Sequence, residues 1–249
     1  MPRCSEALRK LCPPFLNRHP IEVFLELTIV SKELRVTDSS SIVENSKRKK
    51  MKEKIRRVLS QRERQTIIIS DVPLAPAAVL LPLYEREGEY YILFTKRTQK
   101  VQHHKGQISF PGGARHDEDQ DLVGTALRET FEEIGVHPED VEILGELDRM
   151  STFTSNFLIT PFVGIIPYPY GFTISRDEIE ELVKVPISAL LDKNNYREEF
   201  QVYEGMTYSA SFFEYEGKVI WGATARILKQ FLDLVFDEGS DFKRTSNGT

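Results

Sequence analysis

The chain has 249 residues, of which 40% are hydrophobic, and this is enough apolar material for one ordinary domain with an extension. Its formal net charge is −5, so it lacks the basic excess with which proteins bind long nucleic acids. No apolar run approaches the roughly 20 residues that a membrane-spanning helix needs, so we expect neither nucleic acid nor membrane as a partner.

The N-terminal fifth of the chain differs in composition from the rest. Residues 1–50 hold one apolar segment, Ile21–Val30, and no chemical motif. A serine-rich stretch and then the basic run Lys47–Arg57 mark a change that we interpret as a domain boundary. We therefore predict an N-terminal extension of unknown role over residues 1–50, a main domain over 51–240 and a flexible tail over 241–249.

The two cysteines, Cys4 and Cys12, lie outside every motif described below and lack the paired spacing of a zinc site. This usage is typical of a reducing compartment, so we expect a cytoplasmic protein.

Helical and strand patterns interleave through the main domain without a βαβ repeat. Apolar residues at helical spacing predict a short helix over Lys52–Arg64 and longer ones over Leu122–Ile134 and Ala223–Phe236. Two β-rich runs that flank a Glu-Arg-Glu-Gly turn, Ala77–Leu83 and Glu89–Thr95, predict a hairpin. Further strands are expected at Val141–Leu147, Leu158–Pro167, Glu181–Val185, Phe200–Tyr203, Tyr208–Tyr215 and Lys218–Ile220.

A cluster of acids stands in the first long helix. Glu129, Glu132 and Glu133 are three and four positions apart, so they project from one face. An acidic helix turn by itself is usually a solvated face. Three carboxylates within one turn nevertheless repel one another, and a hard divalent cation such as Mg²⁺ or Mn²⁺ would relieve that repulsion.

The segment from Gly113 to Val136 resembles the Nudix box, which runs Gly, five residues, Glu, seven residues, Arg-Glu, hydrophobic, any, Glu-Glu, any, Gly, hydrophobic. The second half matches from Arg128 onward, with Thr130 at one apolar position. The first half has one extra residue and carries Asp119 or Gln120 in place of the first Glu.

A longer upstream signature is similar to that of the Nudix coenzyme A pyrophosphatases, in which the extra residue and an Asp at position 119 are expected. It comprises Leu93–Thr98, His104–Gln107 and Phe110–Gly113, although Ala114 and His116 depart from it. The resemblance continues through Asp177–Glu181 with Val185-Pro186 and through Trp221–Leu228, and it covers roughly Lys52 to Val235.

The resemblance implies a role for each residue of the box. Glu129, Glu132 and Glu133 would bind the divalent ion, and Arg128, which a regular helix points away from that face, would form a salt bridge with Asp119. Gly112 and Gly113 would supply special backbone angles and expose backbone groups to metal and phosphate.

Catalysis also needs a base that takes the proton of the attacking water. Glu178 is our candidate, and Glu180 or Glu181 are the alternatives.

Four cationic or titratable side chains precede the box and could hold a pyrophosphate or the 3′-phosphate of coenzyme A: Lys96, Arg97, His104 and Lys105. The pair His103 and His104 could also suggest a metal site, but the acidic cluster suits Mg²⁺ better.

The resemblance implies an α/β (α+β) fold, the Nudix α/β/α sandwich, with a mixed β-sheet between the box helix and the C-terminal helix. It implies hydrolysis of coenzyme A or acyl-CoA to 3′,5′-ADP and 4′-(acyl)phosphopantetheine. One alternative is another nucleotide substrate, such as ADP-ribose, NADH or a nucleoside triphosphate. The other is a non-catalytic nucleotide-binding regulator. A second copy of the chain, as a homodimer, is a further candidate partner.

Overall fold

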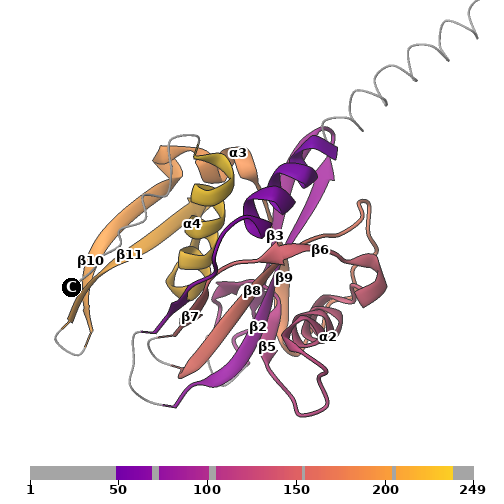
Figure 1. The fold of residues 1–249 in the computed structure, drawn as a ribbon, viewed down its shortest axis with the longest axis horizontal. Coiled ribbons are helices and arrows are strands. Elements are labelled where there is room, and N and C mark those ends of the chain that lie inside the picture. The colour runs from indigo at the N-terminus through magenta and orange to yellow at the C-terminus, as the bar shows by residue number, and fades with distance from the viewer. Residues whose placement is uncertain (1–48, 69–72, 101–104, 153–154, 204–205, 238–249) are drawn as a thin grey trace, which may run out of the picture. The chain divides into compact units, whose positions relative to one another are not determined.

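A computed structural model gives the fold of the main domain (Figure 1). It describes residues 49–68, 73–100, 105–152, 155–203 and 206–237. The chain divides between Lys47 and Arg48, and every described residue belongs to the unit Arg48–Thr249. The predictions for Ile21–Val30, for the two cysteines and for the tail lie outside the described residues.

A mixed sheet forms the centre of this unit. Within the described residues it has nine strands in the order β1-β7-β8-β2-β3-β4, with β5 on β2, β6 on β8 and β9 on β3. Strand β2 runs parallel to β8 and antiparallel to β3, so the sheet is mixed as expected. The strands are β1 (Thr66–Ile67), β2 (Ala75–Arg86), β3 (Glu89–Arg97), β4 (Ile108–Ser109), β5 (Gly112–Ala114), β6 (Glu142–Glu146), β7 (Arg149–Ser151), β8 (Phe157–Ile165) and β9 (Ile179–Pro186).

The predicted hairpin is confirmed as β2 and β3, and both strands are longer than the sequence indicated. Glu87 and Gly88 make the turn, with φ of 54° and 80°. Two consecutive positive φ values are the pattern of a type I′ turn, whose twist matches that of the flanking strands. This hairpin carries Arg97, at the end of β3, toward the box helix.

Helices cover both faces of the sheet. Their ranges are 49–60, α2 (Leu122–Ile134), α3 (Ile187–Leu191) and α4 (Gly222–Phe236), with short 3₁₀ turns at η2 (Pro138–Asp140) and η3 (Lys193–Asn195). Among the described helices, none combines the length and the apolar character that a membrane crossing requires.

Alternation along β2 explains why the sheet is covered twice. Ala78 and Leu80 pack against Ala126 of α2, whereas Leu81 and Leu83 join a larger cluster that includes helix 49–60 and α4. Successive side chains of a strand point to opposite faces, so a strand that is apolar at every position has to be covered on both. The expected placement of the box helix and the C-terminal helix on opposite faces is confirmed.

A second, three-stranded sheet lies beside α4. It consists of β10 (Tyr196–Tyr203), β11 (Met206–Tyr215) and β12 (Lys218–Ile220), all antiparallel, and α4 packs against β11 (Figure 1). Phe213 and Ile220 of this sheet are buried in the same cluster as α4.

The box helix α2 begins and ends at the predicted residues, because the signals for both ends are adjacent to it in the sequence. Asp121 accepts a hydrogen bond from the Gly124 amide at its N-terminus, and Gly135, with φ of 71°, ends it. The first helix ends at residue 60 rather than at Arg64. The sequence did not predict β1, β4, β5, β7 or α3, which have two to five residues each.

Candidate active site

Glu133 is a buried carboxyl group on the inner face of α2. Its exposed fraction is 3%, and its Oε2 atom has no hydrogen-bond partner within the described residues. Burial, with repulsion from Glu129 and Glu178, raises the pKa of Glu133 to about 8, although Arg97 and a hydrogen bond from Thr95 act in the opposite direction. A buried acid with an unsatisfied oxygen is costly to keep, so it indicates a function.

Glu129 lies one turn before Glu133, directly against the glycine pair of β5. A Cβ atom on Gly113 would stand 2.5 Å from Cδ of Glu129, so a larger residue there would displace the Glu129 carboxylate. Partial burial also raises the pKa of Glu129. The structure therefore places the first predicted box glutamate beside Gly113 and close enough to the third, Glu133, to raise its pKa.

Arg128 and Asp119 form the predicted salt bridge, which is confirmed. Nε and Nη2 of Arg128 donate to the two carboxylate oxygens of Asp119 at 2.8 and 3.1 Å. The same carboxylate accepts from the His116 amide and the Thr125 hydroxyl, both at 2.9 Å. These donors hold the pKa of Asp119 well below its usual range, so the loop before α2 is pinned to the helix by a permanent charge pair.

Arg128 does more than the sequence indicated, and the prediction that it points away from the acidic face is wrong. Its Nη1 donates to Glu129 at 2.8 Å and to Glu132 at 3.1 Å, and its Nη2 donates to the Ala114 carbonyl at 3.1 Å. A long side chain can bend along the helix surface to positions one and four residues ahead. Arg128 thus neutralises part of the acidic cluster that it borders.

Glu178 completes the group of acids from a different element, the loop before β9. Its carboxylate lies 3.9 Å from Arg97, whose other nitrogen lies 3.7 Å from Glu133. Of the three acids considered as the base, Glu178 lines the cavity described below, whereas Glu180 and Glu181 pair with Lys96 at 3.0 and 3.3 Å.

The predicted phosphate-binding cations separate in the structure. Arg97 lines the cavity, but Lys96 does not, because adjacent residues of a strand point to opposite faces. Lys105 is exposed and is not part of the cavity wall either. His104 lies outside the described residues. Arg97 is thus the predicted cation that the structure places at the cavity, and contact of Lys96 and Lys105 with phosphate stays a prediction.

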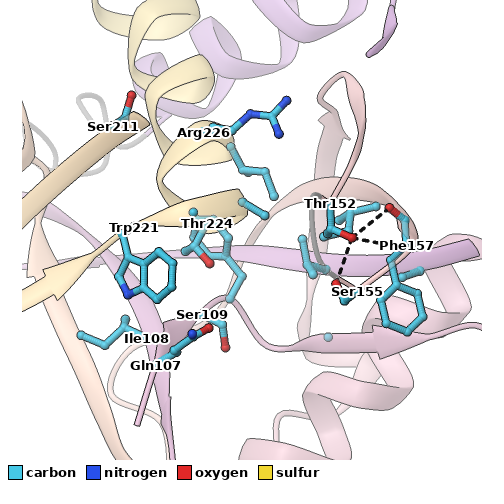
Figure 2. A pocket seen from close by; sticks show the side chains of 18 of the residues that line it. Gln107, Ile108, Ser109, Thr152, Ser155, Phe157, Ser211, Trp221, Thr224 and Arg226 are labelled. Atoms are coloured by element: carbon cyan, nitrogen blue, oxygen red, sulfur yellow. Dashed lines mark hydrogen bonds between the residues drawn. The ribbon is translucent and has the colours of Figure 1, made fainter. Parts of the chain in front are cut away.

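A cavity of about 750 Å³ lies between β5 and the second sheet, and Glu178 is the one acid of the group that lines it, whereas Glu129, Glu132 and Glu133 lie behind its wall. Gly112–Ala114, Arg97 and Glu178 border it on one side, and residues of β11 and the start of α4 border it on the other. Figure 2 shows Trp221 and Thr224 directed into it from the α4 side, with Gln107 to Ser109 below the indole.

Comparison with known proteins identifies the family. The family model described as NUDIX domain matches residues 73–204, which is more than half of the chain. The chain belongs to the Nudix family.

Two curated relatives carry the description Uncharacterized Nudix hydrolase NudL. One, from Enterobacter sp. (strain 638), is 37% identical over 154 residues, 62% of this chain and 79% of that protein. The other, from Yersinia pestis (strain Pestoides F), is 34% identical over 159 residues, 64% of this chain and 79% of that protein. A solved MutT/nudix family protein from Enterococcus faecalis has a TM-score of 0.45 and 14% identity, covering 72% of this chain and 66% of that chain.

Membership settles the general chemistry. A Nudix hydrolase is an enzyme that acts on phosphoric anhydrides, and Nudix hydrolases generally use divalent metal ions. Proteins with the Nudix fold bind small nucleotide conjugates.

The residues present fit such an ion, although they do not enclose one. Within the described ranges no group of three His, Cys, Asp or Glu side chains is arranged to hold a metal, and each box glutamate instead contacts an arginine. Two observations favour a cation: the unsatisfied Oε2 of Glu133 and the close approach of the Gly113 backbone to the Glu129 carboxylate. All the candidate ligand atoms are carboxylate oxygens, which are hard ligands and suit Mg²⁺ or Mn²⁺.

Sequence reasoning missed two parts of this Nudix site. Thr95 is fully buried and hydrogen-bonds Glu133, and its position two residues before Arg97 on the same strand could have indicated that both face α2. The wall made by β11 and α4 had no local signal, because it depends on how distant elements pack.

Proposed function

We propose that this Nudix hydrolase is a divalent-metal-dependent pyrophosphohydrolase of coenzyme A or acyl-CoA, forming 3′,5′-ADP and 4′-(acyl)phosphopantetheine. One observation carries the choice of substrate. Arg97, Gln107, Gly112 and Gly113, all members of the coenzyme A pyrophosphatase signature, line the same cavity as Glu178. A signature whose residues lie on β3, on β5 and in the loop before β4 thus converges on one place.

The size and the lining of the cavity also support a large conjugate. Its volume of about 750 Å³ lies in the upper part of the range of small-molecule sites, roughly 300 to 1,000 Å³. Its walls include aromatic and aliphatic side chains such as Phe212, Trp221 and Ile227, which inorganic pyrophosphate would not need.

The acidic residues would carry the reaction. Glu129, Glu132 and Glu133 would hold the ion, which when bound would neutralise the diphosphate and lower the pKa of a water. Glu178, exposed at the cavity wall, would take the proton of the attacking water.

Arg97 would bind the phosphate oxygens. Its distances of 3.7 Å to Glu133 and 3.9 Å to Glu178 are longer than hydrogen bonds, so both carboxylates orient the guanidinium without occupying it. Gly112 and Gly113 let the backbone of β5 lie close to the reacting diphosphate.

A substrate panel tests the proposal. Purified protein is incubated with Mg²⁺ and, separately, coenzyme A, an acyl-CoA, ADP-ribose or NADH, and the products are separated by chromatography. We expect 3′,5′-ADP from the first two, at a higher kcat/KM than for the others, and no product once a chelator is added. A higher kcat/KM on ADP-ribose or NADH would reject the coenzyme A assignment.

A second candidate substrate class is another nucleoside diphosphate conjugate, such as ADP-ribose or NADH. The observation that favours it is Ala114, which lines the cavity at a position where the coenzyme A signature commonly has a basic residue. The loss of one cation there would matter most for the extra 3′-phosphate of coenzyme A, so the same panel decides between the two classes.

A further inference from the structure

Trp221 is the only tryptophan of the chain, and it stands at the wall of the cavity. Its exposed fraction is 47%, whereas the apolar residues that follow it along α4, such as Ala225, Ile227 and Leu228, are buried. Its half-exposed ring lies at the cavity wall and so presents a flat apolar surface to whatever the cavity binds.

The backbone presents this ring to the cavity. Trp221 is extended, with φ of −147° and ψ of 179°, and Gly222 follows with φ of +67°. A Cβ atom on Gly222 would meet nothing within 4 Å, so packing does not require glycine there. The left-handed φ of Gly222 does require glycine, because this angle turns the chain into α4 directly after the indole.

Polar side chains lie near the edge of the Trp221 indole. Figure 2 shows Gln107, Ser109 and Thr224 around Trp221, and β12, which precedes Trp221, packs next to β4. The Ser109 hydroxyl lies 3.4 Å from that of Thr95, which in turn hydrogen-bonds Glu133. The ring therefore lines the same cavity as Arg97 and Glu178, on the opposite wall.

We infer that Trp221 is the platform on which the adenine ring of the substrate stacks. A flat indole face binds a flat base well, and side chains that both donate and accept hydrogen bonds suit the edge of a base. An acyl or pantetheine chain would use neither the flat face nor so many edge groups. The inference rests on the proposed function only in taking the ligand to be an adenine nucleotide.

Because Trp221 is the sole tryptophan, its fluorescence reports directly on this wall. Metal-free protein in chelator is titrated with AMP, with 3′,5′-ADP and with pantetheine, with excitation at the red edge of the indole band. We expect saturable quenching by both nucleotides and no change with pantetheine. A response to pantetheine without one to the nucleotides would overturn the inference and place the other half of the substrate on this wall.

Variants test the same point through affinity. Trp221→Leu keeps an apolar side chain but removes the ring, so the Kd for AMP measured by calorimetry should rise roughly ten- to a hundredfold, and Trp221→Phe should restore much of the binding. Phe200→Leu is the matched control, because Phe200 is 82% exposed and is not part of the cavity wall. An unchanged Kd in Trp221→Leu would reject the platform.

Kinetics separate the platform from the proposed substrate. The KM for coenzyme A should rise in Trp221→Leu with kcat nearly constant, because stacking far from phosphorus holds substrate and transition state equally. If coenzyme A is no substrate but AMP binding still depends on the indole, the platform stands and the coenzyme A proposal fails. If coenzyme A is hydrolysed with an unaltered KM in this variant, the platform fails alone.

Discussion

The carboxyl group of Glu133 combines burial, a neighbouring arginine and an oxygen without a hydrogen bond. Glu133→Gln keeps the shape of the side chain and removes its ability to become an anion. We predict a loss of kcat of more than about 100-fold, above what removal of a merely supporting residue near a metal costs. Steady-state kinetics at saturating Mg²⁺ measure it.

Glu139→Gln is the control for that experiment, because Glu139 lies in the 3₁₀ turn η2 with 76% of its side chain exposed. Both variants should keep the circular dichroism spectrum of the parent chain. Wild-type turnover in Glu133→Gln would remove this residue from the proposed site.

Asp119 offers a stability prediction with a defined pH window. Its pKa is lowered from 3.8 by the hydrogen bonds of Arg128, so its charge stabilises the folded state at every pH above the ordinary value. Asp119→Asn should cost about 2 kcal/mol near neutral pH, the usual contribution of hydrogen bonds to a charged group. As the pH falls below about 4, the unfolded chain takes up a proton that the folded chain resists, and the difference between variant and parent should shrink.

Urea unfolding at neutral pH and again at low pH measures this difference. An equal cost at both values would mean that the Asn side chain disturbs packing and that the charge pair contributes little.

At the scale of elements, the two glycines of β5 have different neighbours, so their substitution should have different effects. In Gly112→Ala a Cβ atom would collide with the Ala78 carbonyl at a φ of +150°, so the pairing of β5 with β2 should be lost at a cost of about 2–3 kcal/mol. In Gly113→Ala the atoms nearest to the new methyl group would be those of the Glu129 carboxylate, which can move.

We therefore predict that Gly113→Ala keeps its melting temperature within a few degrees and loses most of its activity, whereas Gly112→Ala melts earlier. Thermal unfolding and turnover on the same samples test this contrast. Full activity in Gly113→Ala would show that the position of Glu129 does not matter for the reaction.

Elements with local signals could be predicted from the sequence, and elements that depend on distant partners could not. Helix α2 matched because its apolar spacing, its Asp121 cap and its Gly135 stop lie within fifteen residues. Strands β4 and β5 have two and three residues and exist only through pairing with β3 and β2. The same limit applies to the site: the acids follow from the box, but the choice between Arg97 and Lys96 needed the strand.

For the whole molecule, the division of the chain between Lys47 and Arg48 leads to a matched pair of truncations. A chain of residues 48–249 should keep the melting temperature and turnover of the full chain. A chain of residues 62–249 lacks helix 49–60, whose Ile55 and Leu59 are buried in the core. It should lose about 3–6 kcal/mol of stability, enough to unfold many domains. A stable shorter chain would contradict this packing argument.

The family match ends at residue 204, in front of β11, β12 and α4, and β11 with the start of α4 supplies most of the far wall of the cavity. On our proposal, the acids that carry the reaction lie within the matched stretch, whereas part of the ligand-binding wall lies after it. A chimera that takes its last fifth from a relative should still cut a diphosphate while accepting a different range of compounds.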